Sequence, residues 1–287
     1  RRTTMKLRTI LSLAGITALA TVALAACSST SSSSNTSSSE ADKKETIVMG
    51  TVGTTKPFSH RDENGELTGF DIELARAIFD GSDQYELTFE TTDGSGQFPG
   101  LDSGRFDLLG NNTSYTKERG EKYLYSYPTA STPSVLAVPK DTDIQSYDDI
   151  GGHSTQVVTG TTTAAQLEEY NTQHTDKPVE INYTGENITQ ILTNINDGKY
   201  DFKIFDAPTV NAIIADQNLT NLKTIELEAA EKPFIYYVFS SDNTALQSFV
   251  NDRIKALNED GTIAKLTEQF FGKDYAPTAE ELAIPNE

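Results

Sequence analysis

Two stretches of this chain echo each other and indicate its fold. Residues 101–109 read LDSGRFDLL, and residues 195–204 read INDGKYDFKI. Each stretch joins a helix end to a glycine, a basic residue, an aromatic residue, an aspartate and then an apolar strand. Glycine suits the position after a helix, where the backbone turns left-handed. We interpret the echo as two similarly built lobes, although a chance likeness is the alternative because helix–glycine–strand junctions are common.

The segments around the echo alternate strands with helices. Residues 47–49 read as a short apolar strand, and Asn64-Gly65 is typical of a hairpin turn. A helix is predicted over 71–79. Another is predicted over 188–195, where apolar residues recur at i, i+3, i+4 and i+7. This alternation predicts an α/β fold with right-handed crossovers.

Ligands of open α/β sheets bind beyond the carboxyl ends of the strands. After the first echoed strand come the polar residues 111–116 and Arg119, and after the second comes Asp206. One lobe thus offers a cation and the other an anion, which suits a zwitterion. The echoed Asp107 and Asp201 stand at the strand starts, away from this edge, and are interpreted as structural.

The composition excludes several function classes. The net charge is −19 at pH 7 and no basic stripe occurs, which argues against nucleic-acid binding. Three histidines and one cysteine are too few for a structural zinc site, and a disulfide within the chain is excluded. We therefore expect no metal and no cofactor.

The first residues have the pattern of a secretion signal. Basic residues precede an uncharged apolar run over 10–26, which ends in Leu24-Ala25-Ala26-Cys27. This tetrapeptide resembles the lipobox of bacterial lipoproteins, in which the cysteine is lipidated. The alternative is an ordinary cleavage site with an incidental cysteine. We predict a signal peptide over 1–26 and a lipidated Cys27 that anchors the protein, with palmitate among its acyl chains, at the extracellular face of the cell membrane.

A polar tract follows Cys27. Residues 28–39 are serine and threonine with one asparagine, a composition typical of a flexible tether. We assign 27–44 to the lipidated tether and begin the fold near residue 45.

From 47 to 272 the chain resembles the amino-acid-binding proteins of ABC importers, the solute-binding family that takes polar amino acids. The resemblance rests on the following stretches: 56–58 (KPF), 62–71 (DENGELTGFD), 99–101 (PGL), 116–119 (TKER), 160–162 (GTT) and 260–263 (DGTI). It implies the type II periplasmic-binding-protein fold, in which two α/β lobes joined by two crossover hinge strands close on the ligand. The implied ranges are 45–137 with 234–275 for the first lobe, 138–233 for the second and 276–287 for a tail, with crossings at 134–137 and 236–239.

The same resemblance implies a non-catalytic, monomeric receptor that delivers its ligand to an ABC permease. Arg119 corresponds to the arginine that binds the ligand's α-carboxylate, with a planar fork that lysine lacks. Asp206 corresponds to the acid that takes the α-ammonium, and it can also cap the helix that Pro208 opens.

Further site residues come from the loops. Thr161 and Thr162 stand at a helix start, where free N–H groups attract anions, although a plain N-cap is the alternative. Asn112, Thr113 and Ser114 match the family's polar loop, whereas Asn111 is more typical of a turn.

Many relatives hold the ligand side chain between two aromatic rings. Those positions are Thr55 and Gly94 here, which cannot stack on a ligand. The candidates for a substitute ring are Phe58, Phe98, Tyr115 and Tyr236, and we include Thr55 and Phe58 in the predicted site. The pattern over 110–119 looks like that of the cystine-type members, so cystine is the expected ligand.

Rival functions stay open on the sequence alone. Cyclohexadienyl dehydratases look similar, but an enzyme needs a general acid or base in the cleft, and the histidines are scattered. Two further rivals are a surface adhesin and a sensor that signals to a membrane kinase.

Overall fold

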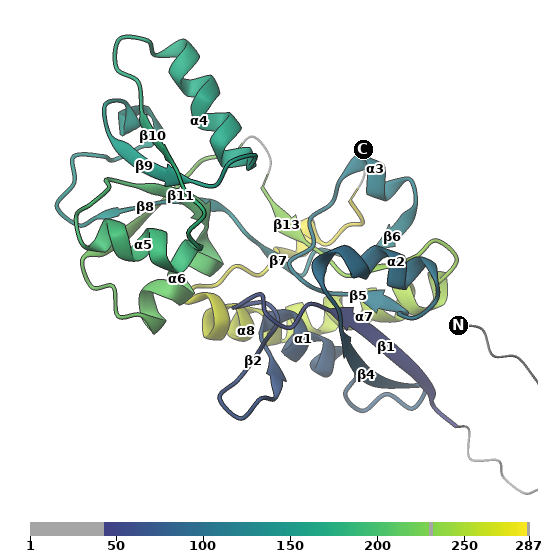
Figure 1. Cartoon of the computed structure of the whole chain (residues 1–287). Coiled ribbons are helices and arrows are strands. Elements are labelled where there is room, and N and C mark those ends of the chain that lie inside the picture. Colours follow the sequence, from purple (N-terminus) through teal and green to yellow (C-terminus); the bar gives the residue numbers. More distant parts are fainter. Residues whose placement is uncertain (1–42, 230–231, 286–287) are drawn as a thin grey trace, which may run out of the picture. The chain divides into compact units, whose positions relative to one another are not determined.

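A computed structural model describes residues 43–229 and 232–285 (Figure 1). The predicted signal peptide, Cys27 and most of the predicted tether lie outside the described residues. Within the described ranges the chain forms two α/β lobes, and the first lobe is made of two separate chain segments. None of the helices in these ranges is both long and apolar enough to span a bilayer.

The first lobe is built on a five-stranded sheet (Figure 1). Its strand order is β4 (Tyr85–Thr91), β1 (Glu45–Thr51), β5 (Leu108–Leu109), β14 (Val238–Ser240) and β6 (Tyr123–Tyr125). The first three strands are parallel, while β14 runs antiparallel to both of its neighbours. A strand from the far end of the chain therefore lies between two strands from its first half.

Helices cover both faces of this sheet. Leu108 and Phe239 belong to the core shared with α1 (Phe70–Phe79), α7 (Thr244–Glu259) and α8 (Thr262–Phe271). Leu109 and Val238 point to the opposite face, as alternation along a strand requires, and pack in a cluster with α2 (Gln97–Asp102). The short helices η1 (Gly94–Gly96) and α3 (Lys117–Gly120) lie in the loops after β4 and β5.

The second lobe is a contiguous segment. Strand β8 (Ser134–Pro139) pairs antiparallel with β11 (Lys203–Asp206) and β12 (Leu222–Glu226), and β9 (Ser154–Val157) pairs parallel with β10 (Glu180–Tyr183). A parallel bridge from Thr155 to Phe202 joins the two groups. The helices are α4 (Thr162–Gln173), α5 (Ile188–Asn196) and α6 (Ala207–Asp216), and η2 (Tyr147–Ile150) lies between β8 and β9.

The echoed stretches form the same junction in each lobe. Gly104 and Gly198 adopt left-handed φ values of 70° and 74° after α2 and α5. Asp107 Oδ2 then accepts the N–H of Val48 at 2.7 Å, and Asp201 Oδ2 accepts the N–H of Ser154 at 2.7 Å. Each aspartate thus ties its junction to the neighbouring strand, β1 or β9. The structural role predicted for both aspartates agrees with these contacts.

The crossover lies earlier in the chain than the sequence indicated. Strands β7 (Ala130–Ser131) and β13 (Phe234–Ile235) pair antiparallel as the two crossing segments. The expected crossing at 134–137 is wrong because these residues already pair with β11 and β12 in the second lobe. The expected crossing at 236–239 is displaced as well, since Val238 and Phe239 belong to the five-stranded sheet. Apolar strands on both sides of the hinge made its position ambiguous.

Local turn and helix predictions agree with the structure. Strands β2 (His60–Arg61) and β3 (Leu67–Thr68) form the hairpin around Asn64-Gly65, with Gly65 at φ 83°. Helix η3 (Ala279–Glu281) follows α8 in the predicted tail, where Glu281 pairs with Lys232 at 3.0 Å.

Candidate ligand-binding site

The loop after β5 carries three of the predicted ligand residues and is held from two sides. The backbone N–H of Asn112, at φ 50°, donates to Asp71 Oδ2 at 2.7 Å. Thr113 is buried, and its carbonyl oxygen accepts the N–H of Tyr236 at 2.9 Å. Ser114 is exposed and bridges to β13. The loop is therefore fixed by helix α1 and by the returning crossover segment.

Asp71 is a supporting residue that the sequence analysis did not identify. It lies in the first turn of α1 and is 3% exposed. Burial raises the pKa of its carboxyl group to about 7, and the hydrogen bond from Asn112 opposes this rise. The backbone carbonyl of Asp71 also accepts the Tyr237 hydroxyl at 2.6 Å. Its position at a helix start, directly after a glycine and a phenylalanine, resembled that of an ordinary first-turn acid.

Arg119 is the cationic side chain of the first lobe that we predicted to bind the ligand. It lies in α3, capped by the Thr116 hydroxyl, and its guanidinium carbon is 4.7 Å from the centre of the Phe98 ring. A cation over an aromatic face is attracted by the ring's quadrupole. No ion pair of the described residues involves this guanidinium. A partly buried arginine with this surrounding can bind a carboxylate through two parallel hydrogen bonds.

Aromatic rings gather beside Arg119. The Tyr125 ring meets those of Tyr115 and Tyr236 edge-on, at centroid distances of 5.1 and 5.7 Å. Burial raises the pKa of Tyr125 to about 12, although the positive charge of Arg119 acts in the opposite direction. Three of the rings that the sequence offered as substitutes, Phe98, Tyr115 and Tyr236, therefore lie in this cluster.

Phe58 does not fit the ligand role assigned to it. Its side chain is 0% exposed, and its ring packs against that of Phe271 at 5.1 Å in the core under α8. A fully enclosed ring offers no face to a ligand, so Phe58 is a core residue here. Thr55 is half-buried and forms a tight turn with Ser59, whose carbonyl accepts its N–H at 2.6 Å.

The second lobe brings its predicted residues to the ends of two joined strands. Thr161 follows β9 and caps α4, its hydroxyl accepting the N–H of Ala164 at 3.2 Å, and Thr162 begins that helix. Asp206 ends β11 and caps α6, with Oδ1 accepting the N–H of Thr209 at 2.9 Å. Both cap interpretations agree with the structure.

The electrostatic setting of Asp206 differs from that of an ordinary cap. Burial raises the pKa of its carboxyl group, while hydrogen bonds from Thr209 lower it. A carboxylate that has lost part of its hydration gains from a nearby positive charge. An ammonium group that approached Asp206 would supply that charge.

A buried polar network stands behind the end of β9. Gln156 donates to Glu186 Oε2 at 2.9 Å and accepts from Asn194 at 2.8 Å. Lys203 is 4% exposed and donates to the Gln156 carbonyl at 2.9 Å, and burial lowers its pKa to about 8. These bonds hold the strand that leads into Thr161 and Thr162.

Besides His60 Nδ1, three buried polar atoms of the first lobe have no well-formed hydrogen bond among the described residues: Gln97 Oε1, Asn111 Oδ1 and Tyr125 Oη. The Tyr125 hydroxyl is still close enough to Arg119 and Thr116 for hydrogen bonds from them to oppose the rise of its pKa. In the sequence Asn111 has the pattern of a turn residue, and neither Gln97 nor Tyr125 stands in a motif that indicates function.

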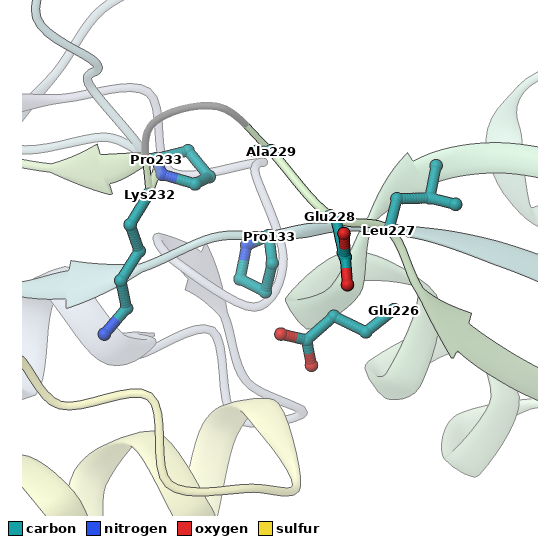
Figure 2. A pocket seen from close by; sticks show the side chains of 7 residues that line it. All are labelled: Pro133, Glu226, Leu227, Glu228, Ala229, Lys232 and Pro233. Atoms are coloured by element: carbon teal, nitrogen blue, oxygen red, sulfur yellow. The ribbon is translucent and has the colours of Figure 1, made fainter.

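A separate hollow of about 400 Å³ lies at the crossover (Figure 2). It is lined by Pro133, Glu226, Leu227, Glu228, Lys232 and Pro233, among others. Its lining contains none of the predicted ligand residues.

Comparison with known proteins identifies relatives of this chain. "Probable amino-acid-binding protein YxeM" of Bacillus subtilis is 33% identical over 79% of this chain and 84% of its own length. "L-cystine-binding protein TcyJ" of the same organism is 30% identical over 83% of this chain and 88% of its own. A solved structure that addresses glutathione import in Gram-positive bacteria, via GshT and the cystine ABC importer TcyBC of Streptococcus mutans, contains a chain 48% identical to this one. The match covers 83% of this chain and all of that chain, at a TM-score of 0.69.

Two α/β lobes with polar loops at their strand ends define a binding protein of the type II periplasmic class. The family model of bacterial extracellular solute-binding proteins, family 3, matches residues 47–273, and the chain belongs to that family. It is an amino-acid-type solute-binding protein of ABC importers and not an enzyme.

Proposed function

We propose that the chain is a lipid-anchored receptor that binds a cysteine-containing ligand, either the amino acid L-cystine or the tripeptide glutathione, and delivers it to an ABC permease. The observation that carries this proposal is the pair of charges at the strand ends. Arg119 has no ion-pair partner among the described residues of the first lobe, and Asp206 in the second has a raised pKa. The cystine-binding relatives and the 48% identity to a chain from the glutathione-import structure support this ligand class.

In the proposed complex each end of the zwitterion has partners on both lobes. The α-carboxylate binds Arg119 and the N–H groups at the start of α4, beside Thr161 and Thr162. The α-ammonium binds Asp206 and the loop formed by Asn112, Thr113 and Ser114. Because only the closed arrangement offers both sets of partners, the ligand stabilises closure by its differential affinity.

The experiment is a ligand screen by thermal unfolding, followed by calorimetry. The panel contains L-cystine, reduced and oxidised glutathione, L-arginine and the remaining amino acids. A ligand at 100 times its Kd adds about 2.7 kcal/mol to the unfolding free energy, which a melt resolves. If neither cystine nor glutathione shifts the melt while another amino acid does, the ligand class is wrong.

The site itself is tested by Arg119→Ala. We expect Kd to rise more than tenfold because the ligand carboxylate loses a charged partner. Arg105→Ala is the matched control, since Arg105 also stacks on a ring, that of Phe106 at 4.9 Å, but pairs with Glu90. Equal affinity in the two variants would contradict the assignment of Arg119.

A further inference from the structure

We propose that a contact between α6 and α8, flanked by two ion pairs, holds the lobes in their unliganded arrangement and opens when they close on a ligand. Each of its three interactions joins a residue of the first lobe to a residue of the second. Because ligand binding must then break them, they set the affinity of the receptor from outside the ligand site. The inference rests on the proposed function only for the ligands used as probes.

The centre of this contact is one hydrogen bond. Asn211 of α6 donates from Nδ2 to the carbonyl of Phe271, the last residue of α8, at 3.3 Å. Gly272 follows with a left-handed φ of 78°, and a Cβ atom there would lie 3.9 Å from the Asn211 Cβ. The end of α8 therefore meets α6 with its backbone.

Two ion pairs accompany the hydrogen bond. Lys56 pairs with Asp216, the last residue of α6, and Lys273 Nζ lies 3.2 Å from Glu226 Oε2 at the end of β12. In both pairs the first lobe supplies the lysine and the second lobe supplies the acid. The four side chains are 41% to 62% exposed, so these are surface ion pairs, each of which contributes little energy and can break.

Two hollows adjoin the hydrogen bond, and Asn211 and Gly272 line both of them. The first, of about 240 Å³, is also lined by both partners of the Lys56 ion pair. The second, of about 550 Å³, is also lined by both partners of the Lys273 ion pair. The lobes thus meet here over a narrow area, unlike the close-packed interior of a lobe. Such surfaces can separate without opening a core.

The crossing segments lie between this contact and the ligand loop. Ile235 of β13 pairs with Ala130 of β7 on one edge and bridges to Ser114 of the ligand loop on the other. Ser131 of β7 pairs with β13 on one edge, and on the other its N–H donates to the Tyr275 carbonyl, after α8, at 2.9 Å. A rotation about this two-stranded ribbon that closes the ligand side therefore opens the side of α8.

The predicted ligand residues of the two lobes are not joined to each other. Among the described residues, no hydrogen bond or ion pair links Arg119 or Asn112 to Thr161, Thr162 or Asp206. The structure thus has the contact between α6 and α8 formed and the ligand residues unlinked. This is the arrangement that a ligand must convert.

Linkage gives the direction of the effect on affinity. A contact that exists only in the open arrangement lowers the population of the closed, binding-competent form, and the apparent Kd rises by the same factor. Loss of the contact should therefore tighten binding, the opposite of what removal of a ligand contact does. A surface ion pair changes an equilibrium constant by only a few fold, so the gain is of that order.

The test is calorimetry of the double variant Lys56→Gln, Lys273→Gln with L-cystine and with glutathione. We expect Kd to fall by about twofold to tenfold for the ligand that the wild type binds. The difference from wild type should shrink in about 1 M NaCl, where surface charges are screened. An unchanged or higher Kd would overturn the proposal.

Lys199→Gln is the matched control for each single lysine variant. Lys199 is 58% exposed, and its ion-pair partner Asp197, at 3.9 Å, belongs to the same lobe. The substitution removes the same charge and leaves the contact between the lobes intact, so Kd should stay within about 1.5-fold of wild type. Equal tightening in this variant would assign the effect to net charge and contradict the proposal.

Charge reversal isolates the ion pair itself. Lys56→Glu sets two acids against each other and should lower Kd further than Lys56→Gln does. Asp216→Lys added to Lys56→Glu restores a pair of opposite charges, and Kd should return to within about twofold of wild type. Without this rescue the Lys56–Asp216 pair has no part in holding the lobes.

A ligand-free measurement separates this proposal from the proposed function. Small-angle X-ray scattering compares the wild type with the double variant Lys56→Glu, Lys273→Glu in the absence of ligand. The variant should have a smaller radius of gyration, because both pairs have become repulsive and the closed form gains population. If the wild type binds neither ligand, the proposed function fails and the radius of gyration decides the role of the contact. Equal radii would then overturn it.

Discussion

Asp206 combines a local structural role with a proposed ligand contact. Its side chain caps α6 through the Thr209 N–H, and its pKa is raised by burial. Aspartate and asparagine are about equally good N-caps, so the capping role tolerates the loss of charge whereas the contact with an ammonium does not. The two roles can therefore be separated by substitution.

We predict that Asp206→Asn raises Kd by tenfold or more while changing the unfolding free energy by less than about 0.5 kcal/mol. For Asp206→Ala we expect the same rise in ligand Kd. Because alanine cannot cap α6, this variant should also lose about 1 kcal/mol of unfolding free energy. Calorimetry and urea unfolding measure the two quantities.

Asn187→Ala is the control for the cap alone. The Asn187 side chain caps α5 by accepting the Gln190 N–H at 2.9 Å, in the same lobe. It should lower stability and leave Kd unchanged. Unaltered binding in Asp206→Asn would remove Asp206 from the ligand contacts.

At the scale of elements, the loop after β5 is attached to α1 by one buried carboxyl group. Asp71 accepts the Asn112 N–H, and its folded pKa is about 7 against an unfolded value of about 3.9. Between these two values the folded state binds more protons than the unfolded state. The stability that this group contributes is therefore present at low pH and is lost as the pH rises toward and through 7.

We predict that the difference in unfolding free energy between wild type and Asp71→Asn falls by about 2 kcal/mol from pH 5 to pH 8. Asparagine keeps an oxygen that can accept the Asn112 N–H, but it does not titrate. Urea unfolding of both proteins at each pH measures the difference. A pH-independent difference would show that Asp71 does not carry this linkage.

Elements with local signals could be predicted from the sequence. Gly104 and Gly198 mark the helix ends, Asn64-Gly65 marks a hairpin, and Pro208 marks the start of α6. The crossing strands could not be located because apolar residues continue through the hinge into both lobes. Phe58 was misassigned because an aromatic residue in a loop motif looks the same whether it turns toward a ligand or toward the core.

For the whole molecule, the sequence predicted the class of architecture. It did not predict which buried polar side chains form hydrogen bonds with one another. The echo at 101–109 and 195–204 indicated two similar lobes, and the residues after each echo include Arg119 and Asp206. Contacts such as Asp71 with Asn112 join distant parts of the chain and have no local pattern. The lack of a hydrogen-bond partner at Gln97 Oε1 and Asn111 Oδ1 is visible only once the packing around them is known.

The proposed lipid anchor at Cys27 determines where the whole molecule is located. We predict that Cys27→Ser in the precursor, produced in a bacterial host, abolishes incorporation of labelled palmitate and removes the protein from the membrane fraction. The ligand Kd should remain unchanged, because Cys27 precedes the segment matched by the family model, 47–273. Metabolic labelling and detergent phase partition measure the first two effects. A Cys27→Ser protein that still fractionates with the membrane would exclude this cysteine as the anchor.

The position of β14 has a consequence for the order in which the protein matures. This strand lies inside the first sheet, between β5 and β6, although it is translated more than 100 residues after them. During translation the amino-terminal half therefore lacks a central strand and the helices α7 and α8 that cover its core. The contiguous second lobe can form before that half is finished. A chain whose first lobe lacks this strand until synthesis nearly ends keeps that lobe unfolded for longer than the second lobe.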